Sequence, residues 1–459
     1  MLRLYRFLVI ILMLLIIPNP AHALELFQFD FPHTFQKPRK MVVDTEDLET
    51  FLDDFFSREM DRLQIPGAVF SMVEGDELVF SKGYGYANLE NKVAVDPEKT
   101  LFRVASISKS FTATAAMQLY EEGLLDMNED VNTYLDNFQL PEAFSAPVTM
   151  AHLLTHTGGF DDRSVNLAFR REEQVPTMET YLSRNMPPRV RPPGEVISYS
   201  NHGLGLAGLV IEKITGEPFV DYAHKNILEP LGMERSSFLL PSHLASDLAT
   251  GYFFSGGYNQ PRDFDFLYNI APAASLNATA NDMANFMIAH LQGGEFSGNQ
   301  ILEKSTLEEM HRQQFTHHQD LEGVTYGFFE RFRNERRFIT HTGLWGGFAS
   351  LLFLYPEEEL GFFVSLNSNA GTEVHRNLLE EFVNEFLPEK ETEDASLTLS
   401  RPFESQVSDC IGHYRPVRYA RHNLEKIAVL TSQCQTTDLG DGNLSLEFSP
   451  QSGHEAIKW

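Results

Sequence analysis

Residues 101–125 read LFRVASISKSFTATAAMQLYEEGLL and place Ser106 and Lys109 three positions apart at the start of a helical pattern. Residues i and i+3 share a helix face, so the hydroxyl and the amine can lie within mutual reach. A serine hydroxyl is a weak nucleophile unless a neighbour takes its proton, and a lysine can do so only when it is neutral. Because a free lysine has a pKa of about 10.4, this role requires burial or a cationic neighbour.

This pair alone is weak evidence, since a chain of this length contains on the order of one Ser-x-x-Lys by chance. The alternative is an N-cap serine beside a solvated lysine. A second element lies in residues 192–201, PPGEVISYSN, where Tyr199-Ser200-Asn201 comes just before an apolar helical pattern. A tyrosine phenol next to a lysine can relay a proton, and an asparagine can hold a substrate amide or carbonyl. Tyr86-Ala87-Asn88 has the same form, but it precedes the serine and lies on a predicted hairpin.

The sequence Thr-His-Thr-Gly occurs twice, at 155–158 in LLTHTGGF and at 340–343 in FITHTGLWGGF. The second copy precedes an apolar strand pattern, where a Thr-Gly pair can offer backbone groups to a substrate and glycine permits close approach. The first copy ends a short helical stretch, and its glycine predicts a structural helix cap. His152 and His156 have the i, i+4 spacing of a zinc helix, but residue 153 is Leu and no acidic third ligand is near, so we expect no metal site.

The serine, the tyrosine and the second Thr-Gly follow one another at intervals of 93 and 142 residues. In this order they resemble the serine β-lactamase and penicillin-binding-protein family, in the branch of class C β-lactamases, D-stereospecific peptidases and related esterases. Flanking stretches such as GLLDMNEDVNTYL and PAASLNATANDMANFM are similar to family landmarks. The resemblance covers residues 45–388.

The resemblance implies an acyl-enzyme mechanism without a metal or an organic cofactor. Ser106 would attack a carbonyl, while Lys109 and Tyr199 would take its proton and later deliver it to the leaving group. The oxyanion hole would consist of the backbone N–H groups of Ser106 and Leu344.

The resemblance also implies a substrate-binding set. Asn201 and His341 would orient the substrate, and Thr342 and Gly343 would form the strand beside it. Many true β-lactamases carry Lys where this chain has His341, and a histidine with a pKa near 6.5 is mostly neutral at pH 7. We therefore hypothesise that the site favours peptides, amides or esters over carboxylate-bearing β-lactams.

The hydrophobic periodicity predicts an α/β (α+β) fold. A helix over 44–63 and a hairpin over 67–88 open the domain, and two strands followed by a helix over 346–387 close it. Helical patterns and loops fill most of 100–314, so one sheet built from both ends should carry an inserted helical domain. The family resemblance implies that this sheet is antiparallel and flanked by helices. The family resemblance places the active site in the groove between the sheet and the helices.

The N-terminus of the chain predicts export. Residues 1–23 have the basic, apolar and A-x-A layout of a secretory signal peptide, and residues 24–44 form a leader. We expect a periplasmic or extracellular protein with no stable membrane insertion after cleavage. The formal net charge of -28 argues against nucleic acid and anionic lipid as partners. The family resemblance implies a small-molecule or peptide substrate.

Beyond residue 388 the sequence predicts a polar linker at 389–402 and a small β-rich module at 403–459, whose end is consistent with a truncated chain. Cys410 and Cys434 are the only cysteines, and one hypothesis pairs them in a disulfide. Three alternatives to a peptidase or esterase remain: a true β-lactamase, a non-catalytic sensor that binds peptidoglycan fragments, and an interaction protein whose C-terminal module recruits partners. The sequence does not indicate an oligomeric state.

Overall fold

The structure is a computed structural model that describes residues 43–389, 410–431, 433–439, 444–448 and 457–458. The predicted signal peptide, nearly all of the leader and nearly all of the linker lie outside the described residues. Within the described part, no helix is long and apolar enough to cross a bilayer.

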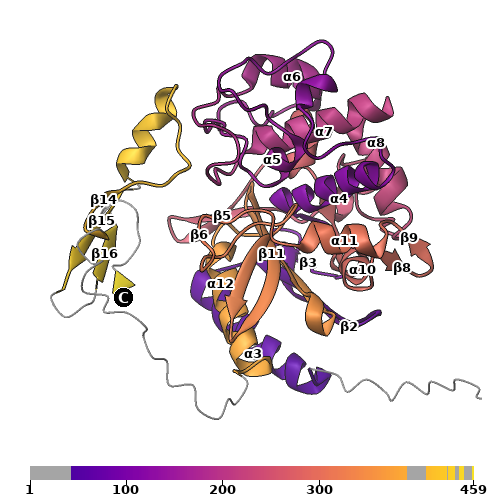
Figure 1. The fold of residues 1–459 in the computed structure, drawn as a ribbon. Coiled ribbons are helices and arrows are strands. Elements are labelled where there is room, and N and C mark those ends of the chain that lie inside the picture. The colour runs from indigo at the N-terminus through magenta and orange to yellow at the C-terminus, as the bar shows by residue number, and fades with distance from the viewer. Residues whose placement is uncertain (1–42, 390–409, 432, 440–443, 449–456, 459) are drawn as a thin grey trace, which may run out of the picture. The chain divides into compact units, whose positions relative to one another are not determined.

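A seven-stranded antiparallel sheet forms the centre of the fold, in the order β10-β11-β12-β13-β1-β2-β3 (Figure 1). Its strands are β1 (Gly67–Glu74), β2 (Glu77–Asn88), β3 (Val93–Ala94), β10 (Phe329–Arg333), β11 (Arg336–Trp345), β12 (Phe348–Tyr355) and β13 (Leu360–Leu366). β1 pairs with β13, so the two ends of the domain meet in the middle of the sheet. The predicted architecture is confirmed.

Two helices from the ends of the domain cover one face of this sheet, namely α3 (Thr45–Leu63) and α12 (Gly371–Phe386) (Figure 1). Asp44 caps α3, because its carboxylate accepts the N–H groups of Glu46 and Asp47. The apolar stripes of both helices enter a phenylalanine-rich core, whose members include Phe55, Phe56, Phe70, Phe353, Phe362 and Phe382.

Helices from the middle of the chain cover the opposite face. α10 (Ala280–Leu291) packs on β1 and β13, and α4 (Ser108–Glu121) is buried from Ser108 to Leu119. β1, β12 and β13 are buried along their whole length because both faces of the sheet are covered. This explains why these strands read as continuous apolar runs instead of alternating patterns.

The inserted region carries the remaining helices and three two-stranded pairs. Its helices are α5 (Met150–Leu154), α6 (Met178–Asn185), α7 (Asn201–Thr215), α8 (Phe219–Ala223), α9 (Ala271–Ala274) and α11 (Lys304–His311). Its short strands are β4 (Phe102–Arg103) with β7 (Asn277–Ala278), β5 (Tyr252–Ser255) with β6 (Tyr258–Pro261), and β8 (Glu295–Phe296) with β9 (Asn299–Gln300).

The C-terminal part forms a second antiparallel sheet, β14-β15-β16-β17. Its strands are β14 (Gly412–Tyr414), β15 (Cys434–Asp438), β16 (Leu444–Phe448) and β17 (Ile457–Lys458), and a 3₁₀ helix spans Leu424–Thr431. Cys410 and Cys434 both carry free thiols in the structure, so the hypothesised disulfide is not formed. The described residues from Val43 onward belong to one compact unit. The segment before β15 contacts the inserted region.

Candidate active site

Ser106 lies in a tight turn that leads into α4. The turn is a 3₁₀ helix, Ala105–Ile107, and Ala105 has a left-handed φ of 48°. This conformation costs a non-glycine residue roughly 1–2 kcal/mol, so the surrounding contacts must hold it. Ser108 supplies two of them, because its Oγ donates to the Ala105 carbonyl at 2.6 Å and accepts the Leu276 N–H at 3.0 Å.

Lys109 is buried beside the serine, with 1% of its surface exposed. Its Nζ contacts Ser106 Oγ at 3.0 Å, Asn201 Oδ1 at 2.9 Å and the Ala273 carbonyl at 2.6 Å. Burial holds the pKa of Lys109 well below its usual value, and the positive charge of Arg418 lowers it further. The predicted requirement for burial or a cationic neighbour is therefore met twice.

Tyr199 lies immediately before α7. Ser200 is the N-cap of this helix, with its Oγ accepting the Gly203 N–H at 3.0 Å, so the cap fixes the position of the residues on both sides. The tyrosine ring centre is 4.7 Å from Lys109 Nζ, and the phenol is hydrogen-bonded with Ser106. Burial raises the pKa of Tyr199 to about 12.

Asn201 is tied to the lysine through its side-chain oxygen, which accepts from Lys109 Nζ. The expected role of Asn201 was to orient the substrate. The structure adds a contact that also positions Lys109, and the residue still lines the groove.

The second Thr-Gly lies on β11, whose segment Thr342–Trp345 extends past the end of β10. In the described part of the chain, the edge of this segment away from β12 has no neighbouring strand. Gly343 is required here, because a Cβ at this position would lie 2.0 Å from the Val104 carbonyl oxygen and 3.3 Å from the Ser106 nitrogen. The close approach allowed by this glycine is thus to the serine turn itself.

His341 is buried, with 2% of its surface exposed. Its Nδ1–H donates to the Thr342 carbonyl at 2.8 Å, and its Nε2 has no hydrogen-bond partner among the described residues. Burial, together with the nearby Lys109, lowers the pKa of His341 to about 3. The ring therefore carries no charge at neutral pH.

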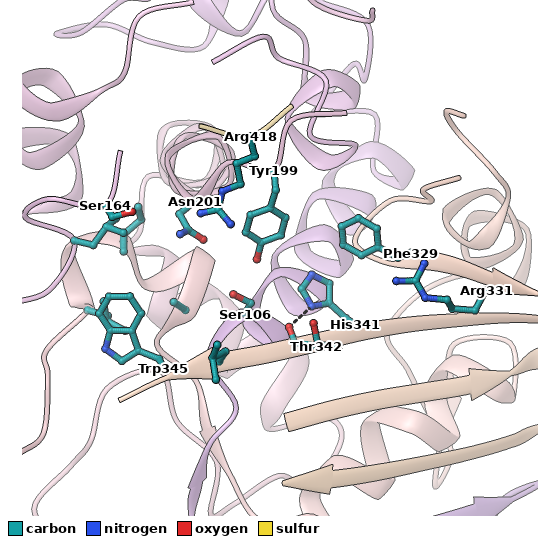
Figure 2. A pocket seen from close by; sticks show the side chains of 15 residues that line it. Ser106, Ser164, Tyr199, Asn201, Phe329, Arg331, His341, Thr342, Trp345 and Arg418 are labelled. Carbon is teal, nitrogen blue, oxygen red and sulfur yellow. Dashed lines mark hydrogen bonds between the residues drawn. The ribbon is translucent and has the colours of Figure 1, made fainter. Parts of the chain in front are cut away.

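These residues line a groove of about 430 Å³, shown in Figure 2. Ser106 lies at its floor beside β11, with Tyr199 and Asn201 on the α7 side and His341 and Thr342 on the strand side (Figure 2). Leu344 also lines the groove, and Lys109 is buried behind it. Ser106 and Leu344, which are 238 positions apart in the sequence, thus line one groove around the Ser106 hydroxyl.

The beta-lactamase family model matches residues 52–382 of the chain. The chain belongs to the beta-lactamase family. Protein flp of Staphylococcus aureus strain N315 is 24% identical over 329 residues, and the match covers 71% of this chain and 64% of that protein. The chain therefore matches less than two thirds of the length of this relative.

Two further proteins support the family assignment. Penicillin-binding protein 4* of Bacillus subtilis strain 168 is 26% identical over 356 residues, covering 72% of this chain and 74% of the relative. The octameric penicillin-binding protein homologue from Pyrococcus abyssi superposes with a TM-score of 0.63 at 26% identity, covering 91% of this chain and 90% of that one.

His156 is a residue of this beta-lactamase family site to which the sequence gave only a structural role. Its ring centre is 4.3 Å from that of Tyr199, and its Nδ1 accepts the Ser200 N–H at 3.2 Å. α5 ends in a Schellman motif in which the Thr157 N–H bonds to the His152 carbonyl and His156, not a glycine, takes the left-handed position with φ 58°. The prediction of a glycine cap was wrong in this detail.

His152 and His156, which have the i, i+4 spacing of a zinc helix, have separate hydrogen-bond partners. His152 Nδ1 accepts the Thr149 N–H in the capping box of α5, while His156 Nδ1 points to the start of α7. Among the described residues no cluster of three His, Cys, Asp or Glu could hold a metal.

Arg418 is the second residue that the sequence did not indicate. It comes from the C-terminal part, lines the groove, and lies with its guanidinium carbon 4.9 Å from the Tyr199 ring centre (Figure 2). The order and spacing of the sequence motifs do not predict a role for Arg418, because this residue lies outside the region that resembles the family.

Proposed function

We propose that this protein is an exported serine hydrolase that acts through an acyl-enzyme on a peptide, amide or ester bond, with D-amino-acid peptides and small esters as the favoured substrates. The observation that carries this proposal is the environment of Lys109. The amine is buried, and two of its three contacts are fixed acceptors, Asn201 Oδ1 and the Ala273 carbonyl.

These contacts orient the proton acceptor. A neutral amine has two N–H bonds and one lone pair, and the two acceptors use both N–H bonds. The lone pair then faces Ser106 Oγ, 3.0 Å away, and accepts the hydroxyl proton. The depressed pKa of Lys109 favours this neutral form of the amine.

In the acylation step, the Ser106 proton moves to Lys109 and Oγ bonds to the substrate carbonyl carbon. The resulting oxyanion is held by the N–H groups of Ser106 and Leu344, both beside the free edge of β11. When the bond to the leaving group breaks, Tyr199 donates its proton to that group and is reprotonated from Lys109. A phenol with a pKa of about 12 stays protonated, so Tyr199 acts as a relay and not as the resting base.

Deacylation follows the same path with water as the nucleophile. The pair of Lys109 and Tyr199 takes the proton of the water, the water oxygen attacks the acyl carbon, and Ser106 leaves as the restored hydroxyl. Asn201, His341 and Thr342 line the walls that would hold the substrate during both steps.

A fluorophosphonate probe tests the nucleophile. We expect wild type and Ser164→Ala to label and Ser106→Ala not to label. Ser164 is the matched control, because it is another serine that lines the groove. Equal labelling of wild type and Ser106→Ala would refute the assignment, and absence of labelling in all three proteins would favour the non-catalytic, fragment-binding alternative.

A true β-lactamase is the alternative that the family match favours. The neutral His341 argues against it, since the carboxylate of a β-lactam would meet no positive charge at this position. We expect slow or no turnover of nitrocefin by wild type and a gain in His341→Lys. Fast turnover by wild type, or no gain in the variant on a carboxylate-bearing substrate, would count against our hypothesis.

A further inference from the structure

A C-terminal segment, residues 415–425, is anchored beside the groove. Its main attachment is Asp161, whose side chain is 2% exposed. The Asp161 carboxylate accepts the Arg421 N–H at 3.0 Å and the His422 N–H at 3.1 Å, and it lies 3.0 Å from His422 Nδ1. A buried carboxylate is costly unless such donors satisfy it. Since these donors all come from 260 or more residues further along the chain, the anchor depends on the segment being in place.

Two additional contacts continue the attachment. The Arg191 guanidinium donates to the Val417 carbonyl at 3.0 Å, and the Ser164 N–H donates to the Glu425 carboxylate at 3.1 Å. The segment is therefore held on both sides of Arg418.

This attachment places the Arg418 guanidinium at the groove. Its Nε lies 3.2 Å from Asp162 Oδ2, and its side chain remains 40% exposed. Arg418 has no other ion pair among the described residues. A guanidinium has five N–H donors in a planar arrangement. Because Arg418 pairs with Asp162 through Nε, its Nη groups can donate hydrogen bonds to a second acceptor.

The charge of the groove differs from that of the chain as a whole. The protein has a formal net charge of -28, yet the described residues that line the groove include two arginines, Arg331 and Arg418, and no Asp or Glu. Arg331 is paired with Glu322 at 2.7 Å. Because His341 is neutral, Arg418 is the cation that lines the groove on the α7 side, beside Tyr199 (Figure 2).

We propose that Arg418 binds a carboxylate of the substrate, on the wall of the groove opposite His341. This inference rests on the proposed hydrolase function and specifies its substrate class: acyl donors or leaving groups with a carboxylate that reaches across the groove toward α7. A carboxylate next to β11, as in a β-lactam, meets the uncharged His341. The C-terminal part is then a component of the active site that determines specificity.

Two matched pairs of esters test this proposal, one for each side of the scissile bond. The first pair is the 4-nitrophenyl esters of N-succinyl- and N-succinamoyl-D-alanine, and the second is the 3-carboxyphenyl and 3-carbamoylphenyl esters of N-acetyl-D-alanine. We expect the carboxylate member of at least one pair to have a kcat/KM about 10-fold higher in wild type, mainly through KM, as a charge-assisted hydrogen bond provides. Arg418→Gln should remove this preference, which is measured as the ratio within each pair. Loss of the Arg418 charge raises the pKa of Lys109 and can slow both members of a pair, but it does so equally.

Arg415→Gln is the matched control, because Arg415 lies in the same segment but stacks on Tyr419 and does not line the groove. It should keep the preference. Asp161→Ala removes the anchor, leaves Arg418 in the chain, and should lose the preference, with release of the segment visible as faster proteolysis at 415–425. In Arg418→Gln the anchor remains, so its proteolysis should match that of wild type.

The proposal is overturned if neither pair shows a preference in wild type, if the preference persists in Arg418→Gln, or if it is lost only in Arg331→Gln. Calorimetric binding of the same ester pairs to Ser106→Ala reports the carboxylate preference without turnover. Failure of the hydrolase proposal, seen as no Ser106-dependent cleavage of the uncharged esters, is therefore distinguishable from failure of the Arg418 proposal.

Discussion

The two Thr-His-Thr-Gly copies have the same four residues and different structures. The copy at 155–158 ends α5 in a turn, with His156 in the left-handed region, whereas the copy at 340–343 lies in the extended strand β11. Both histidine rings are nevertheless buried, and both contact Phe329, at centre distances of 6.0 Å for His156 and 5.7 Å for His341. The two copies therefore meet at one site, where both histidine rings contact the same phenylalanine.

The difference shows that the neighbours of a motif decide its backbone. A helix end precedes the first copy, and an apolar strand pattern follows the second. The functional consequence also differs: the first histidine supports Tyr199 and the start of α7, and the second copy brings the strand edge to Ser106. Neither histidine carries a charge at neutral pH, because burial lowers the pKa of both.

The largest expected effect separates the two glycines. In Gly343→Ala the new Cβ meets the fixed Val104 carbonyl at 2.0 Å, which forces β11 away from the serine turn. In Gly158→Ala the nearest atom, at 2.7 Å, belongs to the side chain of Phe160 and not to the backbone of the serine turn. We expect Gly343→Ala to reduce kcat/KM by about 100-fold, as a displacement of about 1 Å from the reacting geometry does.

Gly158→Ala serves as the control and should cause a much smaller loss. Circular dichroism and thermal unfolding establish whether both variants keep the fold. Similar losses of activity in the two variants would show that β11 has no special role in the geometry of the site.

A change of pH should reveal what the two copies share. The pKa of His341 is about 3 in the fold and near 6.5 in the unfolded chain, so the unfolded state binds more protons between these values. Wild type should lose about 2 kcal/mol of unfolding free energy through this residue between pH 7 and pH 5. The His341→Asn variant should not show this loss of unfolding free energy. The His156→Asn variant should likewise lose less unfolding free energy than wild type between pH 7 and pH 5.

Denaturant unfolding at both pH values measures this difference, as the gap between each variant and wild type. If the gap for His341→Asn is the same at pH 7 and pH 5, the fold does not lower the pKa of His341, and burial does not keep this ring uncharged at pH 5.

The smallest expected effect distinguishes the backbones of the two copies. At position 156, glycine should be more stable than alanine by about 1 kcal/mol, because φ is positive there. At position 341, alanine should be more stable than glycine by roughly 0.5–1 kcal/mol, because glycine weakens a strand. Urea unfolding of His156→Gly, His156→Ala, His341→Gly and His341→Ala tests this reversal, and the same order at both positions would contradict it.

Local sequence was sufficient for the elements of the fold and for the order of the motifs. Hydrophobic periodicity predicts the helix before β1, the hairpin, and the final strands and helix. It does so because the spacing of apolar residues follows the helical or extended geometry of the segment itself. Ser106, Lys109, Tyr199 and His341 were found because their spacing and order resemble a family. The similar motif Tyr86-Ala87-Asn88 was correctly predicted to lie on the hairpin, and the structure places it in β2.

Tertiary structure alone decided the environment of these residues. The depressed pKa of Lys109, the support of Tyr199 by His156, and the fit of Gly343 against Val104 all depend on contacts between distant segments. Arg418 shows this most clearly, because it acts on a lysine 309 positions earlier and no local pattern connects the two. Periodicity and spacing report which face of an element is buried, but desolvation and Coulomb interactions depend on what packs against that face.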